Sequence, residues 1–444
     1  MSAPVSPPGT TLPAKGPVML LTVGGSAQPL ISAIRALGPR FVRFAVTVSV
    51  GTAEGSITML EGETGIPSQS GLNAACWDHV VVPHDDPDRA FAILRESLQA
   101  LQARYPDAEL IADYTGGTKS MSAALLNAVV AVPGVQAQFM VGERPDLNHV
   151  QSGTEQPERL KLTWLLAERE AARLRAGWAR FAYAEAEEGM EIILRDLTGD
   201  DAPPEARREL EDLRDVSALF AAWDRFDHAA ALRRLNAMPE GLQHVLARWR
   251  PSLELLCDPD SRRKGGMQCL DLWRNAERRA ARQLYDDAVA RCYRMLEATA
   301  QWYLSAEHGI DTAQMPWESY RQELAQAKIQ PREGQKELGG LMPSFRFSAA
   351  LKPNGLFATF LQQRTPSSYK KDRRSIEREL RNMLELRNRS VLAHGFQPIG
   401  REGWERFATF CRELFLPQVL KPALEALGLP TDLPQLPQAL PARA

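Results

Sequence analysis

Residues 17–150 alternate short apolar runs with amphipathic segments, and this alternation limits the possible folds more than any other feature of the chain. The apolar runs are rich in Val, Ile, Leu and Phe, which is typical of strands in a buried parallel sheet. Strands are predicted at residues 18–23, 44–50, 79–83, 110–113 and 135–141. Helices are predicted between them at residues 29–37, 87–103 and 120–132. The pattern predicts a mostly parallel, doubly wound, Rossmann-like α/β domain.

Two polar loops follow predicted strands, at the edge where doubly wound sheets bind their ligands. Gly24-Gly25-Ser26 follows the first strand, and Asp113-Tyr114-Thr115-Gly116-Gly117-Thr118-Lys119 follows the fourth and opens a helix. The second loop combines backbone freedom, hydroxyls and a cation at a helix amino terminus, which are groups that hold phosphate or ribose. It lacks the Gly-Lys pair of a Walker A loop, and the chain has no GxGxxG, so a P-loop enzyme and a dehydrogenase are both disfavoured. A tight turn with a capping hydroxyl is the structural alternative.

A second motif, Arg387-Asn388-Arg389-Ser390-Val391-Leu392-Ala393-His394-Gly395, lies near the carboxyl end, in a helix predicted over residues 375–393. Seven residues separate Arg387 from His394. At about 100° per residue their side chains are expected on one helix face, whereas Arg389 is rotated by about 140° from His394. An arginine binds phosphate through its fork of donors and a histidine transfers protons near neutral pH, so the pair suits phosphodiester cleavage. The alternative is an unrelated pair on a solvated helix face.

The remaining chain is predicted to be helical. Residues 158–275 carry apolar side chains at helical spacing and are interpreted as an all-α connecting region. A long helix is predicted at residues 276–303, and residues 336–366 are expected to form a mobile loop. The expected domains are a disordered lead-in (1–16), a sheet domain (17–157), the connecting region (158–275), a helical bundle (276–416) and a Pro-rich tail (417–444). The tail is expected to contain a short helix over residues 419–427.

Composition narrows the class of protein. With 444 residues the chain can hold two or three domains, and no apolar run is long enough for a membrane span. The amino terminus lacks a signal-peptide pattern, and the five scattered cysteines indicate reduced thiols, a cytoplasmic protein and no metal site. Residues 261–412 hold 27 Lys and Arg against 17 Asp and Glu, a balance of +10 within a net charge of −2. This predicts a polyanionic partner, with Lys370-Lys371-Asp372-Arg373-Arg374 as a candidate contact.

Both motifs resemble those of known families. Thr22-Val23-Gly24-Gly25-Ser26, together with Asp113 to Lys119, resembles the CARF domain, a CRISPR-associated Rossmann-like sensor. The Asp-x-Thr-Gly-Gly-Thr-Lys string is the more specific half of this resemblance. Arg387 and Asn388, followed by apolar residues, His394 and Gly395, resemble the HEPN ribonuclease motif. The order of the motifs resembles that of the CARF–HEPN ribonucleases of type III CRISPR systems.

The HEPN resemblance implies a metal-independent, allosteric endoribonuclease of antiviral defence that cuts single-stranded RNA as a homodimer without a cofactor. Two facing motifs would build one site, in which the RNA 2′-hydroxyl attacks the adjacent phosphorus and leaves a 2′,3′-cyclic phosphate. Arg387 would stabilise phosphoryl charge, and His394 would transfer a proton or orient the 2′-hydroxyl. Asn388 would brace the site. Arg389 also satisfies the family spacing and stays open as the phosphate ligand.

The CARF resemblance implies that two sheet domains bind one cyclic oligoadenylate activator, a tetra- or hexa-adenylate, across a two-fold axis. The expected contacts are Gly24, Gly25, Ser26, Thr115, Gly116, Gly117, Thr118 and Lys119. Two other functions stay open on the sequence alone. One is a nucleotide-sensing regulator whose helical domain only binds RNA or protein, and the other is a HEPN toxin that no nucleotide gates. Whether the sheet domain also degrades its activator is a further open question.

Overall fold

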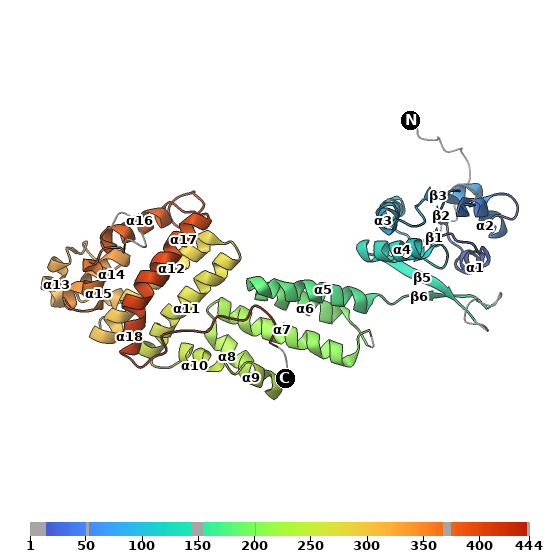
Figure 1. The fold of residues 1–444 in the computed structure, drawn as a ribbon. Helices are drawn as coiled ribbons and strands as arrows, with labels where there is room; N and C mark the ends of the chain where they lie inside the picture. Colours follow the sequence, from blue (N-terminus) through green and yellow to red (C-terminus); the bar gives the residue numbers. More distant parts are fainter. Residues whose placement is uncertain (1–14, 50–52, 144–153, 200, 367–373, 442–444) are drawn as a thin grey trace. The chain divides into compact units, whose positions relative to one another are not determined.

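The computed structural model describes residues 15–49, 53–143, 154–199, 201–366 and 374–441, which Figure 1 draws in colour. The chain forms two compact units, residues 1–168 and residues 169–444. The predicted lead-in lies outside the described residues except for its last two positions. The basic run from Lys370 to Arg373 also lies outside them.

A six-stranded sheet with the order β3-β2-β1-β4-β5-β6 forms the first unit. The first five strands pair in parallel, and β6 is antiparallel to β5. The strands are β1 (Val18–Thr22), β2 (Phe41–Val46), β3 (Trp77–Val81), β4 (Leu110–Asp113), β5 (Val135–Val141) and β6 (Gln156–Arg159). The predicted mostly parallel, Rossmann-like fold is confirmed.

Helices pack on both faces of the sheet, because alternate residues of each strand point to opposite sides. The helices are α1 (Gln28–Leu37), α2 (Ile66–Gln69), α3 (Pro87–Arg104) and α4 (Lys119–Ala131). Leu20 of β1 belongs to a core with Leu94 of α3 and Leu125 of α4. The next residue, Leu21, belongs to the other core with Ile31 of α1. Both layers follow from the apolar runs that the sequence displays.

Three strands differ from the prediction, and one of them, β3, lies at Trp77–Val81 instead of residues 79–83. β2 begins at Phe41 and ends at Val46, whereas the sequence suggested residues 44–50. Phe41 and Val42 are buried, so the strand starts as soon as apolar side chains can enter the two cores. The sequence does not predict β6, because Gln-Pro-Glu-Arg has no apolar alternation and its side chains are mostly exposed. Its antiparallel register with β5 makes it a strand at the sheet edge.

The second unit is all-helical, and α5 (Thr163–Gly177) leads into it. Its first part holds α6 (Tyr183–Asp196), α7 (Pro204–Asp224), α8 (His228–Ala237), α9 (Glu240–Val245) and α10 (Arg250–Leu256). Its second part holds α11 (Ser261–Ala281), α12 (Tyr285–His308), α13 (Arg321–Gln326), α14 (Leu341–Leu351), α15 (Leu356–Gln362), α16 (Ile376–Asn388), α17 (Arg401–Phe410) and α18 (Lys421–Glu425), with a π-helix at Cys411–Leu420. The expected all-α character of the carboxyl-terminal half is confirmed (Figure 1).

The long helix predicted at residues 276–303 begins in the wrong place, because two helices share this range. α11 begins at Ser261 and ends at Ala281, and α12 begins at Tyr285 after a turn in which Gln283 has φ 62°. A left-handed residue ends a helix, and a glutamine gives no sequence signal for it. The contact of α11 with α12 is nevertheless the most extensive helix pair of the unit, because both helices bury long apolar faces.

The expected mobile loop at residues 336–366 is also a correction, because it contains α14 and α15. Four buried aromatic residues hold these helices in the core: Phe345, Phe347, Phe357 and Phe360. Gly340 and Gly355 directly precede α14 and α15, so these glycines mark where the two helices begin. The apolar spacing outweighs the glycine and proline content here.

Buried charges connect the first helices of this unit to α11. Arg278 donates to Asp224 at 2.7 Å and to Asp271 at 3.2 Å, and His228 lies 2.9 Å from the Asp271 carboxylate. All four side chains are buried. Burial by itself raises the pKa of Asp271, but Arg278 and His228 outweigh it and lower that pKa below its ordinary value. His228 therefore has a structural role.

The Pro-rich carboxyl-terminal segment packs against the helices. Leu433 and Leu436 are buried, and the carbonyl oxygen of Pro437 accepts a hydrogen bond from the Tyr183 hydroxyl at 2.6 Å. The Trp249 indole donates to the carbonyl oxygen of Gln435 at 3.1 Å. The Pro-rich tail that the sequence predicts is therefore packed on the protein, where it covers aromatic residues of the first helices.

Candidate functional site

The two predicted ligand loops lie side by side, because β1 and β4 are parallel neighbours whose carboxyl ends meet at one sheet edge. Their glycines let the backbones approach closely. A Cβ built on Gly24 would lie 2.5 Å from the Gly117 nitrogen, and one on Gly116 would overlap the Thr22 carbonyl oxygen. The Thr22 hydroxyl also donates to the Gly116 carbonyl oxygen at 2.6 Å. The two loops therefore form one interlocked structure.

Asp113 supports the second loop through its buried carboxylate. Its Oδ1 accepts from the Thr115 nitrogen and its Oδ2 from Gln138 Nε2, both at 2.9 Å. Burial raises the pKa of Asp113 above its ordinary value, against the hydrogen bonds from Thr115 and Gln138, which lower it. The Thr115 hydroxyl accepts from the Met140 nitrogen at 2.8 Å. Gln138 Oε1 is buried and has no hydrogen-bond partner in the described part of the chain.

The Thr118 hydroxyl is committed to the fold. It accepts from the Met121 nitrogen at 3.2 Å, which caps α4, and it donates to the His84 carbonyl oxygen at 2.6 Å. The Thr118 hydroxyl therefore has the helix-capping role that the sequence offers as the alternative to ligand binding. Ser26 and Lys119 are exposed, and Lys119 is the first residue of α4. Because first-turn N–H groups lack intrahelical acceptors, the ammonium and this helix end together suit an anion.

The carboxyl-terminal motif is not wholly helical. α16 ends at Asn388, before the predicted end at residue 393. A tight turn follows, in which the Ser390 carbonyl oxygen accepts from the nitrogens of Ala393 at 3.1 Å and Gly395 at 3.2 Å. The expectation that helical rotation places the histidine on a shared face with the arginine is therefore wrong.

Gly395 closes this turn over the end of α16. A Cβ at this position would overlap the Arg389 carbonyl group, and the Gln397 nitrogen donates to the same carbonyl oxygen at 2.9 Å. The His394 nitrogen donates to the Asn388 carbonyl oxygen at 3.2 Å. The turn thus returns the histidine backbone to the last residue of the helix.

Arg387 is anchored on α12, an element outside the motif. Its guanidinium carbon lies 4.6 Å from the centroid of the Tyr293 ring. Its Nη1 donates to Asn388 Oδ1 at 3.2 Å, so Asn388 can brace this arginine. The Arg387 Nε is buried and has no acceptor among the described residues. Tyr293 is a contact that sequence spacing could not reveal, because the two residues belong to separate helices.

Arg389 and His394 are exposed, and neither side chain has a hydrogen bond or ion pair to any residue that the structure describes. Three apolar side chains of the same turn are also exposed: Val391 at 59%, Leu392 at 50% and Phe396 at 94%. Grouped exposed apolar side chains are typical of surfaces that a partner covers. The turn therefore has the character of an incomplete site.

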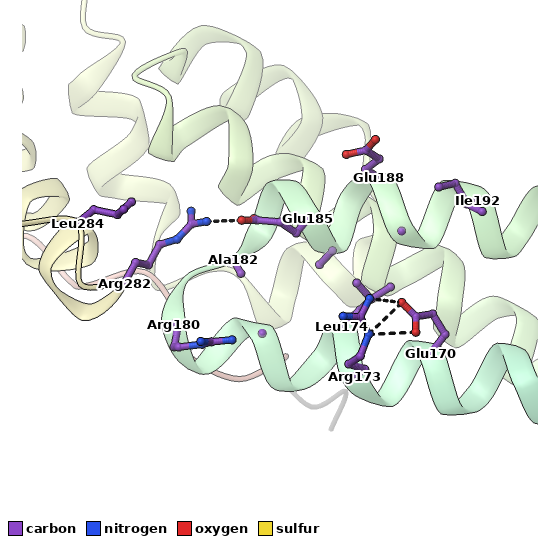
Figure 2. Close-up of a pocket in the computed structure, with 13 residues that line it drawn as sticks. Glu170, Arg173, Leu174, Arg180, Ala182, Glu185, Glu188, Ile192, Arg282 and Leu284 are labelled. Carbon is purple, nitrogen blue, oxygen red and sulfur yellow. Dashed lines mark hydrogen bonds and ion pairs between the residues drawn. The ribbon is translucent and has the colours of Figure 1, made fainter. Parts of the chain in front are cut away.

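A cavity of about 610 Å³ lies elsewhere in the second unit, between α5 and α6 and beside the α11–α12 turn. Figure 2 shows two ion pairs on its wall, Arg173 with Glu170 and Arg282 with Glu185. Three arginines and three glutamates line it, so the wall has no net charge. None of the predicted site residues lines this cavity, and a neutral wall does not favour a polyanion.

The described ranges contain neither a group of metal ligands nor a membrane-spanning helix. They contain no group of three or more His, Cys, Asp and Glu side chains arranged to hold a metal ion. None of the helices in these ranges combines the length and the hydropathy that a membrane crossing requires.

Residues 261–416 match the family model of the Csm6 HEPN domain, and this range includes the whole motif from Arg387 to Gly395. Among solved structures, the chain is similar to the Csm6 protein of Enterococcus italicus, bound to cyclic hexa-2′-fluoro-hexa-dAMP. That similarity covers 92% of this chain and 95% of the other at 12% sequence identity, with a TM-score of 0.50. At this level of identity it shows a shared fold.

A second match is a type III CRISPR defence DNA nuclease activated by cyclic oligoadenylate, which covers 49% of this chain and 36% of the nuclease chain at 18% sequence identity. Its TM-score of 0.23 is too low to support an argument. No curated protein matches the chain. The family model supports the resemblance of residues 261–416 to HEPN domains, and the shared fold agrees with the predicted order of a sheet domain and a helical bundle.

Proposed function

We propose that this CARF–HEPN chain is a cytoplasmic endoribonuclease that cuts single-stranded RNA when a cyclic oligoadenylate binds its sheet domain. One observation carries the proposal: the Csm6 HEPN match spans the end of α16 and the turn after it, where the His394 nitrogen donates to the carbonyl oxygen of Asn388, the neighbour of Arg387. The basic balance of residues 261–412 supports an RNA substrate, because a polyanion is attracted to this half of the chain.

The cleavage chemistry requires charge stabilisation and proton transfer. The RNA 2′-hydroxyl attacks the adjacent phosphorus, the bond to the 5′-oxygen breaks, and the products carry a 2′,3′-cyclic phosphate and a 5′-hydroxyl. Arg387 donates to the phosphoryl oxygens as negative charge develops on them. His394 moves a proton or orients the 2′-hydroxyl. No step uses a metal ion.

We further propose that the active enzyme is a homodimer. The exposed side chains of Val391, Leu392 and Phe396 would lie against the same turn of a second copy, because a two-fold interface pairs identical patches. This arrangement places a second Arg387 and His394 at the same phosphate. It also explains why the side chains of this turn have so few partners within one chain.

The sheet domain is proposed as the switch. Ser26 and Lys119, with the first-turn nitrogens of α4, would bind ribose and phosphate, and the glycine loops would allow the ligand close to the backbone. The ligand of the E. italicus protein, cyclic hexa-2′-fluoro-hexa-dAMP, is a ring of six nucleotides. Cyclic hexa-adenylate is therefore the first activator to test, and cyclic tetra-adenylate is the second. Activation requires that the ligand favour one conformation of the helical site.

The test is RNA cleavage by the full-length protein in EDTA, with each synthetic ring size added in turn. Cleavage with one ring size is expected, with 2′,3′-cyclic phosphate ends, and DNA of the same sequence should stay intact. His394→Ala should lower the rate by about 10²–10⁴-fold. His244→Ala is the matched control, because this histidine is exposed on α9, outside the motif.

Three outcomes would contradict parts of the proposal. Cleavage unaffected by His394→Ala would remove the assigned catalytic residue. Loss of cleavage in EDTA would exclude the metal-independent route. Tight binding of a ring without cleavage of any RNA would favour the regulator whose helical domain only binds.

A further inference from the structure

The contact between Arg387 and Tyr293 joins the end of α16 to the middle of α12. The distance of 4.6 Å from the guanidinium carbon to the ring centroid lies within the range of about 6 Å in which an aromatic face attracts a cation. Both side chains are half-buried. Partial burial strengthens the attraction, because less water competes for the charge.

Tyr293 is itself held in place. Its hydroxyl donates to one carboxylate oxygen of Glu297 at 3.3 Å, and the other oxygen accepts from Arg294 at 2.9 Å. Burial, followed by the nearby Glu297, raises the pKa of Tyr293 against the opposing effect of Arg387. The phenol therefore stays neutral at physiological pH. Because Arg294 balances the charge of Glu297, this carboxylate does not draw Arg387 away from the ring.

Arg387 has no carboxylate partner among the residues that the structure describes, whereas Arg381 on the same helix is paired with Glu377. One N–H of Arg387 donates to Asn388 and the Nε is buried, so the remaining Nη donors, which have no partner among the described residues, are the ones available for a phosphate. The side chain thus combines a fixed position with an uncompensated charge. The charge of Arg389 is also uncompensated, but its exposed side chain lacks the fixed position, because it contacts no aromatic ring within the described ranges.

We propose that Tyr293 is a positioning residue of the cleavage site, whose ring holds the Arg387 guanidinium where the scissile phosphate binds. This inference rests on the proposed ribonuclease function and adds a residue from α12 to the motif. It also selects Arg387 over Arg389 as the phosphate ligand. The ring acts through the arginine and does not touch the reacting atoms.

The experiment compares Tyr293→Phe, which keeps the ring, with Tyr293→Leu, which removes it. Steady-state cleavage of single-stranded RNA is measured with the activating ring at saturation. Tyr293→Phe should keep kcat within about threefold of the wild type, and Tyr293→Leu should lower kcat by about tenfold at nearly unchanged KM. Tyr285→Leu is the matched control, because Tyr285 is also half-buried on α12 and contacts Arg401 instead. It should retain wild-type cleavage.

Crystal structures of the wild type and Tyr293→Leu give a second measurement that needs no activity. Arg387 should be ordered over the ring in the wild type and should leave that position in Tyr293→Leu. A protein that cleaves no RNA with any ring size would refute the proposed function, while this comparison would still decide the contact.

Several results would overturn the positioning role. One is an unchanged Arg387 position, or a wild-type kcat, in Tyr293→Leu. A rise in KM alone would instead assign the ring to stacking on an RNA base. An equal loss of activity in Tyr293→Phe and Tyr293→Leu would assign the effect to the hydroxyl.

Discussion

The sheet loops and the carboxyl-terminal turn are both closed by glycines, but they differ in how far the fold already uses their polar groups. In the sheet loops, the carboxylate of Asp113 and the hydroxyl of Thr118 are committed to backbone or side-chain partners. In the turn, His394 is exposed and has no partner within the described residues. The polar groups of the sheet loops are thus largely satisfied by the fold, whereas the histidine of the turn stays open to a substrate or a second copy.

A motif residue can therefore serve either the shape of a site or its chemistry. The Asp-x-Thr-Gly-Gly-Thr-Lys string mainly builds the interlocked loop and leaves its lysine exposed. The Arg-Asn-x₅-His-Gly string ends a helix, turns back with its glycine, and leaves the histidine free. Substitutions in the first string should therefore act largely through stability, and substitutions in the second through activity.

The largest effect is expected for Gly395→Ala. The added Cβ would overlap the Arg389 carbonyl group, so the turn must open and displace His394. Cleavage should fall by about 100-fold, because a displacement of about 1 Å can have that effect on a catalytic group. The thermal unfolding midpoint should change little, since the turn is exposed. Gly400→Ala is the control, because a Cβ there meets no atom within 4 Å. Full activity of Gly395→Ala would show that the turn does not position the histidine.

Gly24→Ala should act mainly on stability. The Cβ would lie 2.5 Å from the Gly117 nitrogen and force the two loops apart. Overpacking of this kind costs about 1–3 kcal/mol, which denaturant unfolding of the sheet unit would measure. Gly25→Ala is the matched variant for this measurement, because its Cβ meets no atom within 4 Å. Equal stability of the two variants would contradict the interlocked loops.

Lys119→Ala should weaken activator binding by about tenfold, because a charge-assisted contact to phosphate is lost. The affinity should also depend less on salt, since one ion pair is removed. Isothermal titration at two salt concentrations measures both effects. Lys161→Ala is the control, as an exposed lysine of the same unit outside the loop. An unchanged affinity of Lys119→Ala would place the ligand elsewhere.

The smallest effect is expected for Asp113→Asn. Burial raises the pKa of Asp113 in the fold, so the stability from its neutral form is present below about pH 3.9 and is lost as pH rises through the raised pKa. At pH 7 the neutral amide removes a buried charge. It can also donate to Gln138 Oε1, which has no partner among the described residues, once the Gln138 amide turns over.

The unfolding free energy of Asp113→Asn at pH 7 should therefore stay within about 1 kcal/mol of the wild type, whereas Asp113→Ala should lose about 1–3 kcal/mol. The difference between wild type and Asp113→Asn should narrow as pH falls. A loss in Asp113→Asn as large as that in Asp113→Ala would show that the charge itself stabilises the loop.

Much of the fold could be predicted from residue patterns. The apolar runs gave β1, β4 and β5 their correct places, because strands buried on both faces must be apolar. β6 could not be predicted, since its pairing with β5 makes it a strand and its composition does not. The break at Gln283 and the helices within residues 336–366 were missed because tertiary packing overrides local glycine, proline and glutamine preferences.

The candidate sites divide in the same way. Spacing alone identified the loops and the Arg–His motif, because their residue types have a defined chemistry. It placed His394 on a helix that ends at Asn388, since a close backbone approach at Gly395 is a property of three-dimensional structure. It gave no sign of Tyr293, and it left the choice between Arg387 and Arg389 open.

Periodicity and residue type are local properties, so they specify which chemical groups the protein carries and the class of fold that holds them. Tertiary packing specifies which of these groups already have a partner. The Thr118 hydroxyl caps α4 and donates to the His84 carbonyl oxygen. Arg387 lies over the ring of Tyr293 from another helix, and His394 has no partner within the described residues. The physical reason is that hydrogen bonds and ring contacts depend on which distant segments packing brings together.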